Sequence, residues 1–339
     1  MRALPPAASF ATVSDVERGY PADMFGSTVA DCGFKMHDVR DGTGDEPAVR
    51  RDQPPAASEP AVSSSGPMSE EPAHAERSQA SAWFSPTIDE NAALRAGLRL
   101  TGGGGHQSKT MMLTELGLFL EAAKSHGSET ARRWVFEENL LAKTSDAARH
   151  SALANLNKLY GLNRPPPITQ ALASVWGADA PGRPLLALLC ALARDPLLRD
   201  TFEPVSEAQL GQALRWPVLA GAVSRKHPDR FSPAMLKTLS QNCASTWTQS
   251  GHLAGKLNKT RRRAKSTPES AAFAVMLARL AGFGGPALVD SPWLQVLDVP
   301  REERLSLLRR AQGRGLVRMR EAGAVLEIEP AGELALADA

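Results

Sequence analysis

Cysteine is scarce in this sequence: its 339 residues include only Cys32, Cys190 and Cys243, which lie far apart. No disulfide or metal-ligand spacing relates them, which argues against a disulfide framework and against a structural zinc site. Long apolar runs are also missing. No segment approaches the ~18 apolar residues of a membrane-spanning helix, and no apolar signal-peptide core follows Met1. We therefore expect a cytoplasmic protein that does not contact a membrane.

Patterns typical of catalytic and metal sites are missing as well. The histidines show no i, i+4 pairing, and we expect all seven on the surface: His37, His74, His106, His126, His150, His227 and His252. Glu137 and Glu138 form a tight acidic pair, but Arg132 and Arg133 lie close enough to explain them as helix-surface ion pairs. We predict no catalytic residue, no metal ion and no cofactor, and hence a protein that is not an enzyme.

Charge is distributed unevenly along the chain, although its net charge is only +2. Residues 1–90 hold seven Lys or Arg against fifteen Asp or Glu, whereas residues 91–339 hold 32 against 22. The first ninety residues are rich in Pro, Ala, Ser and Gly, and without a hydrophobic period they cannot offset chain entropy. We predict a disordered acidic tail over residues 1–90. Met68-Ser69-Glu70-Glu71 resembles a natural N-terminus, so translation from Met68 is an alternative start.

Apolar periodicity predicts a mainly α fold beyond the tail, with a helical bundle over residues 91–200. Leu116 and Leu120 belong to the stripe of a first helix, and Ser128 can cap a second that runs through Leu141. Ser145 can open a third, which Gly161 stops. Further helices are predicted at 168–176, 184–194, 206–215 and 269–283, with the leucines of 184–194 buried nearly all round.

Residues 215–265 carry eleven basic side chains and one acidic side chain, Asp229. Ser232 and Pro233 favour a helix start. The helix that follows has one apolar stripe, formed by Leu236, Leu239, Cys243 and Trp247. After Gly251 the chain becomes polar and strongly basic. A helix followed by a basic turn is typical of a winged helix-turn-helix, so we predict a winged-helix-like DNA-binding unit over residues 201–266.

Two kinds of DNA contact are predicted for this unit. Side chains on the polar face of the helix approach a groove: Lys237, Gln241 and Ser245. Cations around the helix contact backbone phosphates: Arg225, Lys226, Lys256, Lys259, Arg261, Arg262, Arg263 and Lys265. The alternative is a solvated basic loop without a nucleic-acid partner.

A second unit of similar kind is predicted over residues 267–330, followed by a short tail over 331–339. Asp298 can cap a helix that Gly313 ends, and two alternating segments around a turn at residues 321–323 predict a β-hairpin. The side chains of Arg314, Arg318 and Arg320 are the candidates for a second phosphate-contacting surface. The alternative is a small α/β cap with a charged exterior.

The segment Thr101–Thr110 comes close to a phosphate-binding loop. Gly103, Lys109 and Thr110 fit the pattern G-x-x-x-x-G-K-[ST], but Ser108 replaces the second glycine, which lets the backbone approach the phosphates. A flexible turn that leads into the next helix is the favoured interpretation, and a nucleotide-dependent enzyme is the minor one.

Several short blocks resemble the BrxA family of bacterial BREX phage-exclusion systems. The most specific runs from Glu138 to Ser145 (Glu-Asn-Leu-Leu-Ala-Lys-Thr-Ser) and passes into a basic helix around Arg149. Other blocks that fit the outline are the glycines at 101–105, a helix with Glu115, Phe231-Ser232-Pro233, Ser250-Gly251-His252-Leu253, Gly282-Phe283-Gly284-Gly285 and Ser291-Pro292-Trp293-Leu294. The resemblance spans residues 98–330, and the long acidic tail departs from it, so the chain resembles a divergent member.

The resemblance implies a bundle similar to the NusB antitermination fold, with winged-helix elements, in a DNA-binding protein without enzymatic activity. It also implies partner subunits of a phage-defence system, namely a DNA methyltransferase, an ATPase and a phosphatase-like protein. The basic stretch by itself predicts DNA, expected to be double-stranded, as the partner. The rival hypothesis is an interaction scaffold, in which the Leu-rich 184–194 region docks partner subunits and the basic surface meets an acidic protein.

Overall fold

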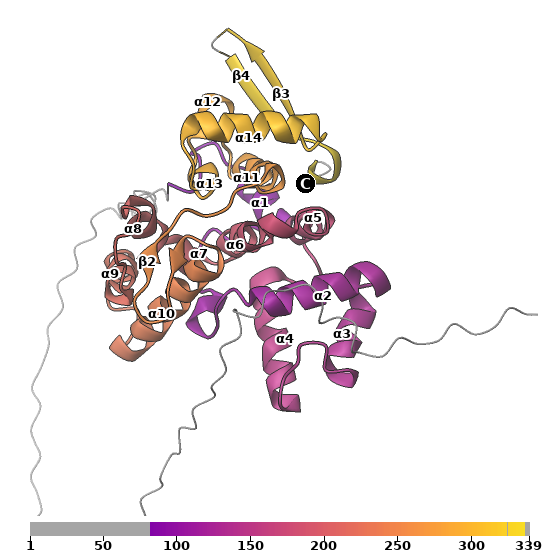
Figure 1. Cartoon of the computed structure of the whole chain (residues 1–339), viewed down its shortest axis with the longest axis vertical. Coiled ribbons are helices and arrows are strands. Elements are labelled where there is room, and N and C mark those ends of the chain that lie inside the picture. Colours follow the sequence, from indigo (N-terminus) through magenta and orange to yellow (C-terminus); the bar gives the residue numbers. More distant parts are fainter. Residues whose placement is uncertain (1–81, 324, 336–339) are drawn as a thin grey trace, which may run out of the picture. The chain divides into compact units, whose positions relative to one another are not determined.

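Helices make up most of the structure, a computed structural model that describes residues 82–323 and 325–335 (Figure 1). The predicted mainly α fold is thus confirmed. Among these residues, no helix combines the length and apolar character that crossing a bilayer requires. In the first half of the described chain the helices are α1 (Glu90–Ala96), α2 (Leu113–His126), α3 (Ser128–Glu137), α4 (Asp146–Tyr160), α5 (Pro167–Trp176), α6 (Arg183–Arg194) and α7 (Pro196–Arg199). The later elements are α8 (Phe202–Glu207), α9 (Trp216–Lys226), α10 (Pro233–Gln249), β1 (Leu253–Ala254), β2 (Thr260–Arg261), α11 (Pro268–Leu280), α12 (Gly285–Val289), α13 (Pro292–Gln295), α14 (Arg301–Gly313), β3 (Val317–Ala322) and β4 (Val325–Pro330).

The fold begins before the predicted tail boundary at residue 90. Trp83 is buried, and its ring lies edge-on against Phe202 and Trp293, with centroids 5.2 and 4.9 Å away. The Trp293 indole N–H also donates to the Trp83 carbonyl oxygen at 2.9 Å. Residues 82–90 therefore belong to the fold, and the rest of the predicted tail, residues 1–81, lies outside the described residues.

Two buried helices form the centre of the core. All residues of α6 from Leu185 to Arg194 are buried, and α6 contacts α4, α5 and α11. The alanine-rich helix α11 is buried from Pro268 to Ala278 and also contacts α13, α14 and β4. Each fully buried leucine contributes about 2 kcal/mol relative to an exposed one. Because every leucine of α6 is among the buried residues, the predicted burial of the leucines of 184–194 is confirmed.

Helices α2, α3 and α4 pack against one another. Ser145 caps α4 as predicted, since its hydroxyl accepts the Ala148 N–H at 3.2 Å. The second predicted helix is too long, because α3 ends at Glu137 and Asn139 has a φ of 52°. The Asn139 side chain accepts the Lys143 N–H at 2.8 Å, which stabilises a loop where the sequence pattern predicts continued helix.

Short elements surround α9 and α10 between residues 202 and 261. Helix α8 contacts α9, and α9 packs along α10. Strands β1 and β2 are antiparallel, with Leu253 opposite Arg261, and Ala213 forms an isolated bridge to Thr260. The helix predicted over 206–215 is wrong beyond Glu207, because the backbone of this segment bonds to residues 259–261 instead.

The predicted C-terminal helix and hairpin are confirmed as α14, β3 and β4. The strands pair antiparallel, with Val317 opposite Pro330, and β3 contacts α14 while β4 contacts α11 and α12. The predicted cap is wrong: Pro300 precedes α14, and the Asp298 carboxylate binds the Arg261 guanidinium and the Ala264 N–H.

Candidate nucleic-acid interface

A groove of about 530 Å³ lies between α10, the start of α9 and the loop of the basic hairpin, which we define as residues 253–261. Gln241, Ala244 and Ser245 of α10 line one side, and residues 214–217 and 256–259 line the others. No Asp or Glu is among the described residues that line it. The groove therefore combines hydrogen-bonding groups on a helix with cations from both neighbouring segments.

The sequence of α10 explains why its polar face is available. Ser232 accepts the Met235 N–H at 3.3 Å and Pro233 takes the first helical position, which confirms the predicted helix start. Leu239, Cys243 and Trp247 are fully buried, so this stripe is held against the core. Lys237, Gln241 and Ser245 recur every four residues and share another face of the helix.

The basic hairpin has a firmly supported loop. Gly255 has a φ of 105°, and a Cβ atom there would collide with the Asn258 carbonyl oxygen, so the turn requires glycine. At the base, the Leu214 N–H donates to the Lys259 carbonyl at 2.8 Å, and the Arg261 N–H donates to the Gln212 carbonyl at 2.9 Å. These bonds hold Lys256 and Lys259 beside α10.

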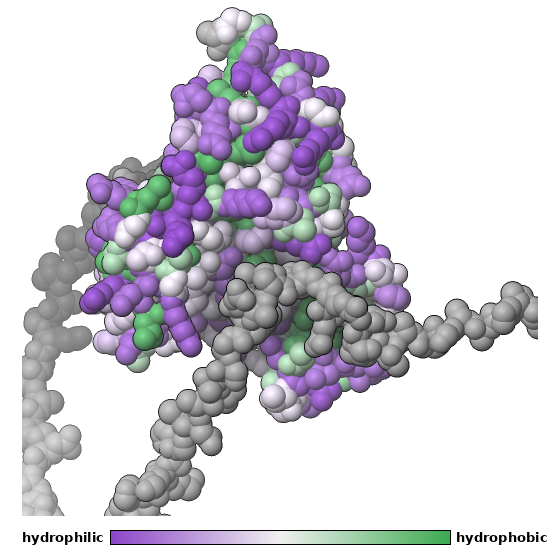
Figure 2. Space-filling model, in the orientation of Figure 1, coloured by the Kyte–Doolittle hydropathy of each residue, from purple (hydrophilic) through white to green (hydrophobic). Residues whose placement is uncertain are grey.

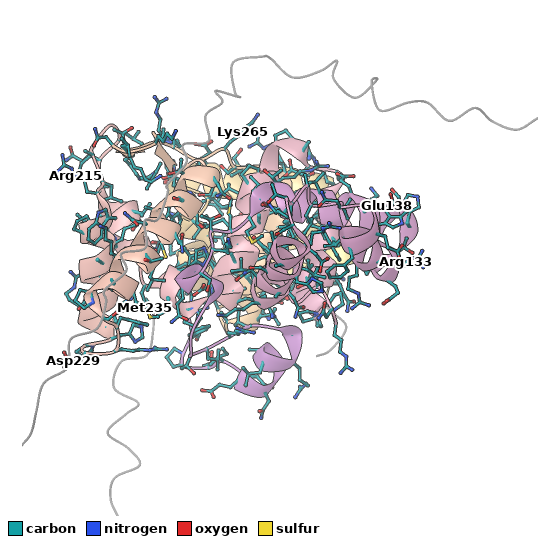
Figure 3. All side chains as sticks on the ribbon, turned by 90° about the horizontal axis from the view of Figure 1, so that it is seen from below. Arg133, Glu138, Arg215, Asp229, Met235 and Lys265 are labelled. Atoms are coloured by element: carbon teal, nitrogen blue, oxygen red, sulfur yellow. The ribbon has the colours of Figure 1, made fainter. Side chains whose placement is uncertain are left out.

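Polar or aromatic neighbours orient two lysines: Lys259, which lines the groove, and Lys237, which does not line it but lies over the groove residue Trp216. The Lys237 ammonium lies 5.8 Å from the centre of the Trp216 ring, within the range of a cation–π contact. The Lys259 ammonium donates to the Thr248 hydroxyl at 3.0 Å, and partial burial lowers the pKa of Lys259. In Figure 3, Asp229 and Arg215 lie at opposite ends of the α9–α10 pair, so the acidic side chain of this stretch is remote from Arg215.

Arg261 does not behave as predicted. Its side chain is 5% exposed, and it forms a two-pronged ion pair with Asp298, at 2.9 Å from Nη1 to Oδ2 and 2.5 Å from Nη2 to Oδ1. It also donates to the His252 carbonyl at 3.2 Å. The guanidinium is therefore occupied inside the protein, and Arg261 supports the hairpin instead of contacting phosphate.

The remaining cations predicted near the hairpin are exposed. Arg262, Arg263 and Lys265 follow β2 and face solvent, but none of them lines the groove. Arg263 instead borders a neighbouring cavity of about 290 Å³, together with His252, Asp298 and other residues. These side chains can extend a positive surface beyond the groove without forming part of it.

Arg225 and Lys226 are separated from the groove by the length of α9. They end the helix whose first residues line the groove, which places them about 14 Å away along its axis at 1.5 Å per residue. Lys226 pairs with Asp200 at 3.2 Å, and Asp200 also binds His227 at 2.8 Å. The structure thus does not bring these two predicted cations together with Lys256 and Lys259.

The predicted C-terminal cations are exposed, but two of them have acidic partners. Arg314 pairs with Glu269, and Arg320 lies 3.6 Å from Glu327. Arg318 forms no ion pair among the described residues, and it borders a different cavity that also contains Glu329 and Asp89. This surface carries mixed charge.

The glycine-rich segment 101–110 forms a turn before α2, as predicted, but its centre, Gly104 to His106, is buried. His106 is fully buried: its Nδ1 lies 2.7 Å from Asp195 Oδ2, and its Nε2 lies 2.8 Å from the Thr246 hydroxyl. A Cβ atom at Gly104 would overlap the Asp195 carboxylate, which leaves no room for a phosphate at this point. His252 is buried as well, so the expectation of surface histidines is wrong at both positions.

Sequence reasoning left several groove residues out of the predicted site. Arg215 lies at the N-cap of α9, and Trp216 and Leu257 also line the groove. Trp216-Pro217, followed by Leu219 and Val223, has the proline and the spacing of a helix start, and this signal identifies α9 once the helix at 206–215 is discarded.

The scaffold alternative loses the helix on which it depended, because α6 is buried inside the protein. On the face drawn in Figure 2, hydrophobic residues of the described chain occur singly or in small groups among hydrophilic ones. The basic groove is consequently the more distinctive surface.

Comparisons with known proteins do not identify a family. A scan against models of protein families matches no part of the chain, and a comparison with curated proteins likewise finds no match. The resemblance to the BrxA family therefore stays a prediction. Within residues 82–323 and 325–335, no cluster of three or more His, Cys, Asp or Glu side chains is arranged to hold a metal ion.

Proposed function

We propose that this protein binds double-stranded DNA without catalysing a reaction, and that residues 202–261 act as a winged helix-turn-helix. In this proposal α10 is the recognition helix and the basic hairpin is the wing. The order of elements supports it: a helix, an extended segment at Ala213, two packed helices and a hairpin whose second strand bridges back to Ala213. A helix of this kind enters the major groove with its exposed face toward base edges.

The observation that carries the proposal is the acid-free groove with the α10 side chains Gln241 and Ser245 between flanking cations. Arg215, Lys237 and Lys256 are exposed and form no ion pair among the described residues. Their charges remain available to phosphates, whose neutralisation supplies most of the affinity of sequence-independent binding. Gln and Ser can hydrogen-bond to bases, so the same surface holds both contact types.

The biological setting we propose is a bacterial phage-defence system of the BREX type. It rests on the resemblance of residues 98–330 to the BrxA family, and it includes the NusB-like description of the helices before α8. The proposed partner subunits are a DNA methyltransferase, an ATPase and a phosphatase-like protein. Co-purification of tagged chain with these three subunits, with and without nuclease, tests this part independently of DNA affinity.

Binding of the full chain to a labelled duplex and to a single strand tests the DNA proposal. We expect tighter binding to the duplex, because a recognition helix fits the major groove of B-form DNA. Six to ten phosphate contacts would lower the affinity by about 10³- to 10⁵-fold between roughly 50 and 200 mM salt. No binding at the lower salt concentration would overturn the proposal.

A further inference from the structure

An apolar side chain stands at the tip of the basic hairpin. Leu257 is 91% exposed, the highest value among the large exposed hydrophobic residues of the described chain. An exposed leucine forgoes about 2 kcal/mol of burial, a loss that a partner could restore. Single exposed apolar residues are common, so exposure alone does not assign a role. A role for Leu257 is indicated by the supported loop that carries it and by the lysines beside it.

The tip is held in place by the elements beneath it. The sharp turn at Gly255 brings the chain back at Asn258, and the loop closes onto β2. In β2 itself, Arg261 is anchored to Asp298 through an ion pair in which only 5% and 13% of the two side chains are exposed. The backbone bridge between Ala213 and Thr260 ties β2 to the segment before α9. Leu257 therefore projects from a supported loop, and inserting it into a partner needs little additional ordering of the hairpin.

The charges around Leu257 select the kind of partner. Lys256 precedes it and Lys259 follows two residues later, and all three residues line the groove beside α10. One leucine cannot form the core of a stable protein interface, which buries about 1,200–2,000 Å². A membrane-binding face needs a broad apolar stripe, which this loop does not offer. An apolar side chain between cations suits nucleic acid, where phosphates flank stacked, apolar base faces.

We propose that Leu257 is a wedge that enters the minor groove of duplex DNA and partly unstacks one base step next to the α10 contact. This inference rests on the proposed DNA-binding function and adds a preference for DNA that deforms easily. Pyrimidine–purine steps, TA above all, unstack and kink at the lowest cost, whereas A-tracts are stiff. Lys256 and Lys259 then contact the phosphates on either side of the opened step.

Two duplexes of identical length and base composition provide the test: one alternates T and A, and the other is an uninterrupted A-tract. The full wild-type chain should bind the alternating duplex about tenfold more tightly, because unstacking is cheaper there. A 2-aminopurine placed in a TA step reports the unstacking directly as a rise in fluorescence. Leu257→Ala and Leu257→Asn should equalise the two affinities and abolish the rise, while the salt dependence stays unchanged.

Val218→Ala is the matched control, because Val218 is another exposed apolar residue, on α9, and does not line the groove. It should keep both the preference and the fluorescence rise. Binding of both duplexes with strong salt dependence, but with no effect of the Leu257 substitutions, would overturn the wedge and leave the DNA-binding function standing. If the wild-type chain binds neither duplex at low salt, the DNA-binding function and the wedge both fail.

Discussion

The protein contains two units in which a helix is followed by an antiparallel hairpin, and they use positive charge differently. In the first, α10 and the basic hairpin, the groove is lined by the cations Arg215 and Lys256 and by no Asp or Glu among the residues that the structure describes. In the second, α14 and the C-terminal hairpin (residues 317–330), Arg318 and Arg320 of β3 lie opposite Glu329 and Glu327 of β4. Both segments are rich in basic residues by sequence, but among the described residues the second pairs Arg309, Arg314 and Arg320 with acids, whereas the groove cations Arg215 and Lys256 form no ion pair.

The ion pairs of the second unit show how this neutralisation arises. Arg309 pairs with Glu321 at 3.3 Å, Arg320 with Glu327 at 3.6 Å, and Arg279 of α11 with Glu329 at 3.0 Å. Opposite charges that face each other across a hairpin attract, as Arg320 and Glu327 do, and the other two pairs join the hairpin to the helices beside it. A basic stretch therefore makes a phosphate-binding surface only where the fold keeps acidic side chains away.

The largest expected difference between the units concerns one ion pair in each, Arg261 with Asp298 at the basic hairpin and Arg320 with Glu327 across the C-terminal hairpin. Arg261→Ala should lower the free energy of unfolding by about 3–5 kcal/mol, because it leaves the largely buried carboxylate of Asp298 without its partner. Arg320→Ala, which removes an exposed pair, should cost about 0–1 kcal/mol. Urea unfolding followed by circular dichroism measures both. Equal losses would show that Arg261 does not anchor the basic hairpin.

His252 gives the first unit a pH dependence that the second, without histidine in residues 301–339, does not share. Burial lowers the pKa of His252 to about 4, from an ordinary value near 6.5. The unfolded state then binds more protons than the folded state, so stability is constant above pH 6.5 and falls as pH drops toward 4. The loss attributable to His252 should reach about 3 kcal/mol.

The variant His252→Gln isolates this contribution. Gln can still donate to the Val296 carbonyl, which the His252 Nε2 contacts at 3.0 Å, but it does not titrate. The difference in unfolding free energy between the wild type and the variant should therefore change between pH 6.5 and pH 4 and be constant above that range. A difference that is independent of pH would contradict a neutral, buried His252.

Helix starts and stops were predictable where a local signal decides them. Ser145, Gly161 and Ser232 do what their residue types favour at helix ends, and the apolar stripe of α10 is buried as its spacing predicts. The helix at 206–215 failed because its backbone groups find partners in residues 259–261, about fifty positions later, and no local pattern reports such pairing.

The candidate site was predictable in part for the same reason. Lys237, Gln241 and Ser245 follow from helical spacing, and the lysines of the basic hairpin follow from composition. Sequence reasoning could not tell that Arg261 is buried while Arg262 is exposed, because the deciding contact is Asp298 on a distant loop. It also left out Arg215, which precedes the first residue of α9 and which the fold brings to the groove beside α10.

Charge removal tests the comparison of the two surfaces directly. A triple variant of two groove cations and the neighbouring Lys237, Arg215→Gln, Lys237→Gln and Lys256→Gln, should reduce the slope of log affinity against log salt by about 2.7, at ~0.9 per lost phosphate contact. A triple variant in the second unit, Arg309→Gln on α14 with Arg318→Gln and Arg320→Gln on β3, removes the same charge from exposed positions. It should change the slope by less than about 1. Fluorescence anisotropy with one duplex at several salt concentrations measures both. Equal reductions would mean that net charge alone governs binding.

The smallest expected effect concerns how the helices of the two units, α10 and α14, begin. Helix α10 begins with a side-chain cap, since Ser232 accepts the Met235 N–H, whereas α14 begins at Pro300 without a side-chain cap. Ser232→Ala should lower the unfolding free energy by about 1 kcal/mol, and Ser232→Asp should retain most of the stability because Asp also caps well. Asp adds a negative charge at the N-terminal end of α10, five positions before Lys237, so it should weaken DNA binding while preserving the helix. Ser232→Ala should lose stability and keep its DNA affinity, whereas Ser232→Asp should keep its stability and lose affinity. This pair of results would establish that the start of α10 affects folding through its cap and DNA binding through its charge.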